Sequence, residues 1–98
     1  MSEITIINPF EIPDGRENAA LEMYDVFAAY FSKQDGYIST DLHQALGDDA
    51  KFHLVSISKW ASQEHFMNAL ESSELGEIFK NAPKDIVTYP SAYKIIRS

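Results

Sequence analysis

The chain has 98 residues, 45% of them hydrophobic and 12% aromatic, which suits one domain with a single modest core. Fifteen acidic against eight basic residues give a net charge of −7, and the basic residues form no run, so neither nucleic acid nor a membrane is an expected partner. The absence of cysteine excludes disulfides, thiolate nucleophiles and cysteine-ligated metals.

The N-terminal stretch lacks the basic start and apolar core of a signal peptide, so a cytoplasmic location is expected. Ile4–Ile7 is a β-branched run that predicts a first strand, and Pro9 predicts its end at a sheet edge or bulge. By the period of two, Asn8 shares a face with the apolar Ile6 and Phe10. One interpretation is that the Asn8 amide bonds the backbone at a strand end; the other is that it serves a site.

A helical pattern covers residues 14–34. Asp14 and Glu17 have the spacing of a capping box at its start, and Gly36 can adopt the left-handed conformation that ends it. Apolar side chains at spacings of three and four form one wide stripe, which predicts a helix lying on a sheet. This stripe consists of Ala20, Met23, Tyr24, Phe27, Tyr30 and Phe31.

Residues 37–46 and 52–60 alternate weakly in polarity around the turn signal Gly47–Asp49, which predicts a hairpin. The first strand is expected to place on one face Tyr37, Ser39, Asp41, His43 and Ala45. The returning strand is expected to place on one face Phe52, Leu54, Ser56, Ser58 and Trp60. Both faces carry apolar groups, and one layer of helices cannot cover two faces, so the pattern indicates a homodimer.

The second half of the chain repeats the helix and strand signals. Ser62 predicts the N-cap of a helix, and Ser72 or Ser73 that of a further short one. Residues 85–97 predict a final strand interrupted at Pro90. The order β-α-β-β-α-β over the single domain 1–98 predicts an α+β, ferredoxin-like fold, with an antiparallel four-stranded sheet and the helices on one face.

A pocket between this sheet and the first helix would be mostly apolar with a few polar atoms, the usual chemistry of a small-molecule site. Its expected lining is Asn8, Phe10, Tyr24, Phe27, Ser56, Trp60, Phe66 and Tyr93. The alternative is that these aromatic side chains only fill the core. No phosphate loop, nucleophile elbow or zinc motif is present, and the three histidines have no metal-ligand spacing, so no metal site is expected.

Three pieces of the chain carry a resemblance to a known family. They are the start INPFEIPDGRE, the strand entry at Gly36 and Tyr37, and the Trp60-x-Ser-x-Glu-x-Phe66 pattern. In this order they resemble the antibiotic biosynthesis monooxygenase domain over nearly the whole chain. The resemblance implies a dimeric α/β barrel, in which the last strand often reaches across to the partner. It also implies oxidation of phenols such as anthrones by dioxygen without metal or flavin.

The family's site residues transfer only in part to this sequence. Asn8 matches an Asn on the family's first strand, and Trp60 matches the Trp at the end of the third. A haem-degrading branch carries a His where this chain has Pro83, which cannot ligate iron, so haem degradation is not expected. Quinone-forming members often carry an Asn where this chain has Ser56, whose hydroxyl can still donate one hydrogen bond.

The sequence therefore predicts an enzyme, a cofactor-independent monooxygenase that oxidises a small phenol-, anthrone- or hydroquinone-like aromatic substrate. Asn8 and Ser56 would hold the substrate oxygen, Trp60 would pack on its ring, and His43 or Tyr93 would transfer protons. The side chains expected to contact the substrate ring are Phe10, Tyr24, Phe27, Phe66, Phe79 and Tyr93. The alternative is a non-enzymatic dimer that binds a small ligand or serves in stress. No sequence feature separates the two.

Overall fold

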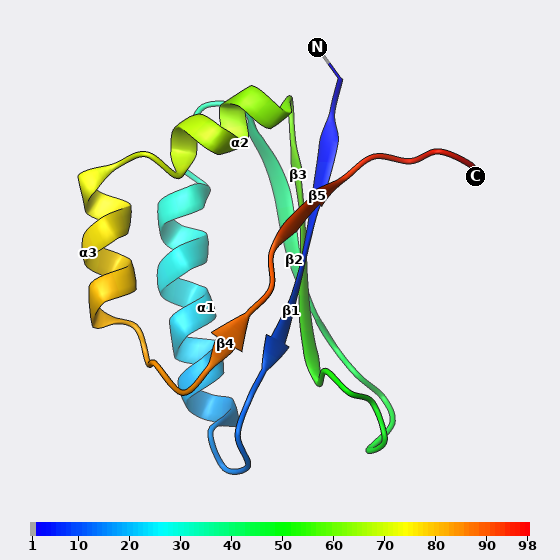
Figure 1. The fold of residues 1–98 in the computed structure, drawn as a ribbon, viewed down its shortest axis with the longest axis vertical. Coiled ribbons are helices and arrows are strands. Elements are labelled where there is room, and N and C mark those ends of the chain that lie inside the picture. Colours follow the sequence, from blue (N-terminus) through cyan, green and yellow to red (C-terminus); the bar gives the residue numbers. More distant parts are fainter. Residues whose placement is uncertain (1) are drawn as a thin grey trace.

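A computed structural model describes residues 2–98 of the chain (Figure 1). Its elements are β1 (Ile4–Glu11), α1 (Glu17–Phe31), β2 (Tyr37–Gln44), β3 (Leu54–Trp60), α2 (Gln63–Ala69), α3 (Ser73–Asn81), β4 (Val87–Thr88) and β5 (Ser91–Tyr93). The strands form one antiparallel sheet in the order β2-β3-β1-β4, and β5 also pairs with β1. All three helices lie on one side of this sheet, which confirms the α+β, ferredoxin-like prediction (Figure 1). The sheet is open, and none of the helices in residues 2–98 could cross a membrane.

The last predicted strand is present in two short pieces. β4 pairs with the end of β1 and β5 pairs with its beginning, and the pairs of β5 continue the register of β4. The break falls at Tyr89 and Pro90, as predicted from Pro90. After Tyr93 the chain leaves the sheet on the side away from the helices, so the expected strand to residue 97 stops early (Figure 1).

The prediction that β1 ends near Pro9 is wrong. β1 continues to Glu11 and lies inside the sheet, between β3 and β4. A proline is tolerated here because the register places it opposite Tyr89, at the break between β4 and β5. At this position Pro9 acts only as a hydrogen-bond acceptor, and its carbonyl oxygen accepts a 3.1 Å hydrogen bond from the Tyr89 amide.

The start and end of α1 differ from the prediction. The N-cap residue is Arg16, and no side chain caps this end, so the capping box from Asp14 is absent. Arg16 instead donates to Asp85 over 2.8 Å, which ties the start of α1 to the segment before β4. The helix ends at Phe31, and Gly36, with φ of +85°, serves the turn into β2 rather than the helix end.

The two other helices begin as the sequence predicts. The Ser62 hydroxyl accepts a 3.2 Å hydrogen bond from the His65 amide at the start of α2, and the Ser72 hydroxyl accepts one of 3.0 Å from the Leu75 amide at the start of α3. Of the two candidates for the second cap, Ser72 is therefore the residue used. These local hydrogen bonds satisfy backbone N–H groups that a helix start leaves free.

A bulge in β2 changes the predicted faces of this strand. The register shifts between Tyr37 and Ser39, so that Tyr37 pairs with Trp60 and Ser39 pairs with Lys59. Since Trp60 and Lys59 point to opposite faces of β3, Tyr37 lies on the helix side and Ser39 on the open side. The prediction that these two residues share a face is wrong for this reason.

The core fills the space between sheet and helices in two clusters. One is built around Phe10, Ala20, Met23, Leu54 and Ile86, and the other around Ile6, Trp60 and Ala69. Trp60 and Leu75 are the largest side chains that the described residues bury fully, each only 1% exposed. Between the two clusters the packing leaves a cavity.

Candidate functional site

The cavity has a volume of about 390 Å³ and lies between the helix side of the sheet and the three helices. This volume is within the range of small-molecule sites. Its floor is formed by side chains of the sheet, mainly Ile6, Asn8, Phe10, Thr40, Ser56, Ser58 and Trp60. Its walls come from the helices and the segment before β5, mainly Tyr24, Phe27, Phe31, Phe66, Phe79, Pro83, Ile86, Thr88 and Pro90.

Four polar side chains gather on the otherwise apolar floor. Asn8 lies opposite Ser56 in the β1–β3 register, and Thr40 lies opposite Ser58 in the β2–β3 register. The four therefore occupy two neighbouring rungs of the sheet on its helix side. The hydroxyl oxygens of Thr40 and Ser56 are 3.5 Å apart, at the outer limit of a hydrogen bond, so both can turn to a ligand at little cost.

The amide of Asn8 is held by one of its two ends. Its Oδ1 accepts a 2.9 Å hydrogen bond from the backbone amide of Tyr89. Asn8 therefore bonds the backbone, as one interpretation predicts, but within β1 and not at the end of the strand. Its Nδ2 has no hydrogen-bond partner among residues 2–98, although the side chain is half-buried and lines the cavity. Nδ2 of this cavity-lining residue is therefore free to donate.

Trp60 is fixed by its neighbours on every side. Its indole N–H donates to the Ser58 hydroxyl over 3.2 Å, and its ring meets those of Phe31, Tyr37 and Phe66 nearly edge to face, with centroids 5.3–5.9 Å apart. Because the Ser58 oxygen accepts from the indole, its own hydrogen is left to donate. Trp60 thus forms a firmly held end of the cavity floor.

The aromatic side chains that form the walls are more exposed toward the outside of the cavity. Phe27 and Phe79 approach to 5.0 Å between ring centroids, yet Phe79 remains 51% exposed. Phe27 is also stacked on Phe31 at 6.5 Å, which links the outer pair to the inner cluster around Trp60. A flat ligand would therefore meet rings on its faces and polar groups along the floor.

The cavity is almost free of charge. Among the described residues that line it, Lys84 alone is charged, and its ammonium group donates to the carbonyls of Phe79 and Lys80 at the end of α3. Burial raises the pKa of Tyr37 above its ordinary value, and the nearby Tyr24 and Asp41 add to this rise. The Tyr37 phenol therefore stays protonated and acts as a neutral group.

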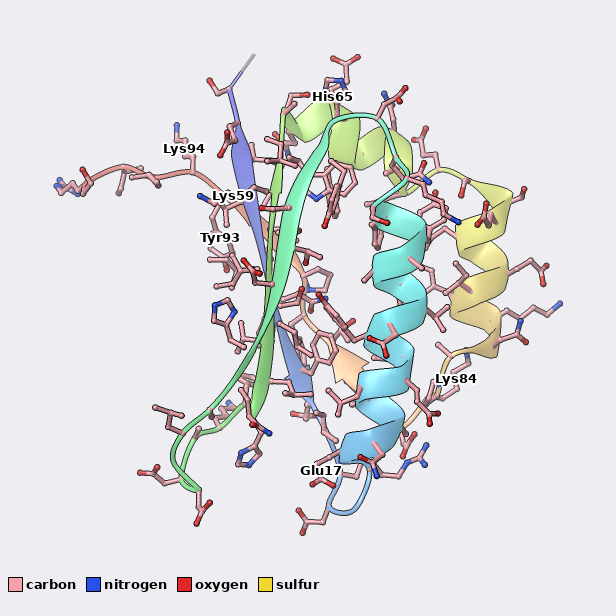
Figure 2. All side chains as sticks on the ribbon, turned by 180° about the vertical axis from the view of Figure 1, so that it is seen from behind. Glu17, Lys59, His65, Lys84, Tyr93 and Lys94 are labelled. Carbon is pink, nitrogen blue, oxygen red and sulfur yellow. The ribbon has the colours of Figure 1, made fainter. Side chains whose placement is uncertain are left out.

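The structure brings together eight of the ten predicted site residues. They are Asn8, Phe10, Tyr24, Phe27, Ser56, Trp60, Phe66 and Phe79. His43 and Tyr93 are placed elsewhere, because His43 pairs with Val55 and Tyr93 pairs with Thr5, both on the open face of the sheet. Figure 2 shows Tyr93 on the side of the sheet away from the helices. The sheet thus separates both residues from the cavity, which corrects their predicted place in the site.

The sequence interpretation missed several residues of the cavity, chiefly Phe31, Tyr37, Thr40, Ser58 and Ile86. Thr40 could have been found by the signal that Asn8 gave, a polar residue on the face of the apolar Leu42. Tyr37 could not, because the bulge that turns it inward has no clear sequence signature. In residues 2–98 no three His, Asp or Glu side chains come together as a metal site.

Comparison with known proteins identifies a family for this chain. Residues 3–81 match the family described as antibiotic biosynthesis monooxygenase, and no curated protein matches the chain. A "putative monooxygenase" from Shewanella loihica PV-4 is 28% identical, with a TM-score of 0.83 over 99% of this chain and 97% of that one. SnoaB from Streptomyces nogalater, a cofactor-independent oxygenase, is 18% identical, with a TM-score of 0.82 over 100% and 97%. Since the family match covers most of its residues, the chain belongs to the antibiotic biosynthesis monooxygenase family.

Proposed function

We propose that this protein is a cofactor-independent monooxygenase that oxidises a small phenolic aromatic compound, such as an anthrone or a hydroquinone, with dioxygen. The observation that carries the proposal is the donor-rich floor of Asn8, Ser56, Ser58 and Thr40 beneath aromatic walls. The structural likeness to SnoaB, itself a cofactor-independent oxygenase, supports the same reaction class.

The floor suits a substrate that carries an oxygen atom with negative charge. Nδ2 of Asn8 and the hydroxyls of Ser56 and Ser58 each keep a hydrogen that can be donated to a ligand. Donors fixed in an apolar cavity stabilise a phenolate far better than water-exposed donors do. Hydrogen bonds to the ionised form also lower the pKa of a bound phenol, so the substrate ionises more easily in the cavity.

Among the described residues, no carboxylate or imidazole lines the cavity to serve as a general base. The proton of the substrate therefore passes to solvent water, and the site contributes the hydrogen bonds that stabilise the phenolate left behind. The phenolate then gives an electron to dioxygen, and the two recombine at the ring carbon. For an anthrone, one CH₂ group and one O₂ become one C=O group and one water, so the four electrons lost by carbon are gained by oxygen.

The proposal is tested by oxygen uptake with 1,8-dihydroxyanthrone in protein freed of metal by a chelator. We expect uptake above the spontaneous rate, and formation of the anthraquinone with one water per O₂. Asn8→Ala should reduce kcat/KM about tenfold, the effect of one lost hydrogen bond to a charged oxygen. The control is Ser39→Ala, on the open face of the sheet. No uptake with anthrones or hydroquinones would reject the proposal.

A ligand-binding role without turnover is the second candidate, favoured by Ser56, which offers a single weakly held hydroxyl. In this case 1,8-dihydroxyanthraquinone would bind and quench the fluorescence of Trp60, the only tryptophan, while no oxygen is consumed. Binding with uptake supports the enzyme, and binding without uptake supports the carrier.

We also propose that the chain forms a homodimer through the open face of the sheet. This face carries Ile7, Val55 and Ile57. Beyond β5 it is flanked by Ile95 and Ile96, which are 77% and 73% exposed. Burial of such side chains is the usual reason for stable association. Light scattering should give twice the chain mass, and Ile57→Lys should halve it, whereas Val26→Lys on α1 should not.

A further inference from the structure

Pro9 lies within β1, and Pro90 lies in the break between β4 and β5 beside it. The common register of β4 and β5 places Pro9 opposite Tyr89 and Asn8 opposite Pro90. Neither proline has an N–H. Because Pro9 and Tyr89 form a hydrogen-bonded pair, the missing Pro9 N–H costs the ladder one donor, whereas the nitrogen of Pro90, in the next pair, faces away from β1. Tyr89 keeps its N–H, and this group lies where the regular pairing is interrupted.

The Tyr89 amide is shared between two acceptors on β1. It donates to the Pro9 carbonyl over 3.1 Å and to Oδ1 of Asn8 over 2.9 Å. The shorter contact goes to the side chain. Asn8 therefore strengthens the sheet at the point where Pro9 weakens it, and its amide is tied to the break between β4 and β5.

This hydrogen bond also fixes the orientation of the Asn8 carboxamide, because the oxygen and not the NH₂ group has to face the Tyr89 amide. A backbone N–H can only donate, and of the two amide ends only the oxygen can accept. The alternative orientation would bring the NH₂ group of Asn8 against the N–H of Tyr89, with a donor facing a donor. The oxygen is thus held by Tyr89, and the NH₂ group is left free to donate.

We infer that the backbone amide of Tyr89 is a positioning group for the site, because it orients the Asn8 carboxamide so that Nδ2 donates to the ligand oxygen. The inference rests on the proposed function for the identity of the ligand. Thr88 and Pro90, on either side of Tyr89, line the same cavity. A ligand that accepts a hydrogen bond from Nδ2 polarises the amide and strengthens its bond to Tyr89, so ligand binding and the order of the segment between β4 and β5 support each other.

The first test detects the hydrogen bond itself by NMR. In protein labelled with ¹⁵N and ¹³C, a scalar coupling across the bond should join the Tyr89 amide nitrogen to Cγ of Asn8. Hydrogen exchange of the Tyr89 amide should slow when 1,8-dihydroxyanthraquinone is added. Absence of the coupling in the free, folded protein would overturn the inference.

The second test separates the two ends of the Asn8 side chain. Asn8→Asp keeps an oxygen for Tyr89 but replaces the NH₂ donor, so affinity for the anthraquinone should fall at least about tenfold while the Tyr89 amide stays protected. Asn8→Ala should lose both the affinity and the protection. Unchanged affinity in Asn8→Asp would contradict the assignment of Nδ2 to the ligand.

The third test removes the Tyr89 donor. Tyr89→Pro lacks the N–H, and its matched control, Tyr89→Ala, keeps the N–H but loses the ring that packs near Phe52 at 5.9 Å. We expect Tyr89→Pro to weaken binding as much as Asn8→Ala, with no further loss in the double variant, and Tyr89→Ala to bind like the wild type. Additive losses, or wild-type binding by folded Tyr89→Pro, would overturn the inference.

Two further outcomes have a defined meaning. If Tyr89→Pro does not fold, the NMR coupling and the Asn8→Asp result decide the inference by themselves. If the wild type does not bind the anthraquinone, the proposed function fails, whereas the coupling still shows whether Tyr89 orients the Asn8 amide.

Discussion

Thr40 and Ser56 lie on neighbouring strands with their hydroxyl oxygens 3.5 Å apart, and each also belongs to a rung of the polar floor. At this distance their mutual hydrogen bond is weak, and a ligand oxygen between them would replace it by two stronger ones. The free protein thus holds these two hydroxyls in a paired arrangement that a ligand can open without leaving a buried donor unsatisfied.

Replacement of Ser56 tests this arrangement. Ser56→Ala should lower kcat/KM for the anthrone about tenfold, because one hydrogen bond to an oxyanion contributes about 1.5 kcal/mol. Thermal stability should hardly change, since the bond to Thr40 is weak. Oxygen-electrode kinetics and calorimetry measure both quantities. A large loss of stability with unchanged kinetics would show that Ser56 serves only the fold.

A buried hydroxyl of Tyr30 joins three helices. It donates to the carbonyl of Ala69 and shares a hydrogen bond with the Ser72 hydroxyl, both at 2.6 Å, while the side chain is 3% exposed. Tyr30→Phe should lower the free energy of unfolding by about 1–3 kcal/mol, because the carbonyl of the buried Ala69 would lose its hydrogen bond and the half-buried Ser72 hydroxyl would lose one of its own. Urea denaturation measures the change, and Tyr93→Phe at the exposed end of β5 is the control, with a change near zero.

Two independent structural features require glycine at Gly36. Its φ is +85°, and an added Cβ would lie 2.3 Å from Cγ of His65. Gly15 has a similar φ of +82° but open space around it. Gly15→Ala should therefore cost only the backbone term of about 1–2 kcal/mol, and Gly36→Ala clearly more. Equal losses in urea denaturation would show that His65 moves aside freely.

The ion pair of Arg16 and Asp85 predicts a pH dependence of stability. The hydrogen bond from Arg16 lowers the pKa of Asp85 below its ordinary value of 3.8. A carboxyl with a depressed pKa in the folded state contributes its stability above the unfolded value, and the contribution is lost as the pH falls through the folded one.

Urea denaturation of the wild type and Asp85→Asn should therefore differ at pH 7, with the wild type the more stable. The difference should shrink below about pH 4 and vanish in stronger acid. Because both side chains are nearly half exposed, salt should reduce the difference at pH 7. A difference that persists in strong acid would assign the effect to something other than the carboxylate.

The parts of the fold that depend on local chemistry could be predicted from the sequence. The caps at Ser62 and Ser72 follow from short-range hydrogen bonding, and the gathering of Asn8, Ser56 and Trp60 follows from the period of two along their strands. A single bulge was enough to move Tyr37 to the other face, because every side chain beyond such an irregularity changes sides.

The two misplaced residues have the same physical explanation. The face of a residue depends on which partner its strand pairs with and in which register, and neither is encoded locally. His43 and Tyr93 acquire their faces from pairing with Val55 and Thr5. A sequence pattern could identify their strands but could not tell on which side of the sheet each side chain would lie.

The sheet and the helices contribute different kinds of side chain to the cavity. The donors stand on the hydrogen-bonded floor of β1, β2 and β3, whereas most of the rings that set its shape come from the helices. Exchange of Phe27 or Phe79, neither of which packs on Trp60, can therefore change which ring system fits while the hydrogen-bond donors of the floor stay in place.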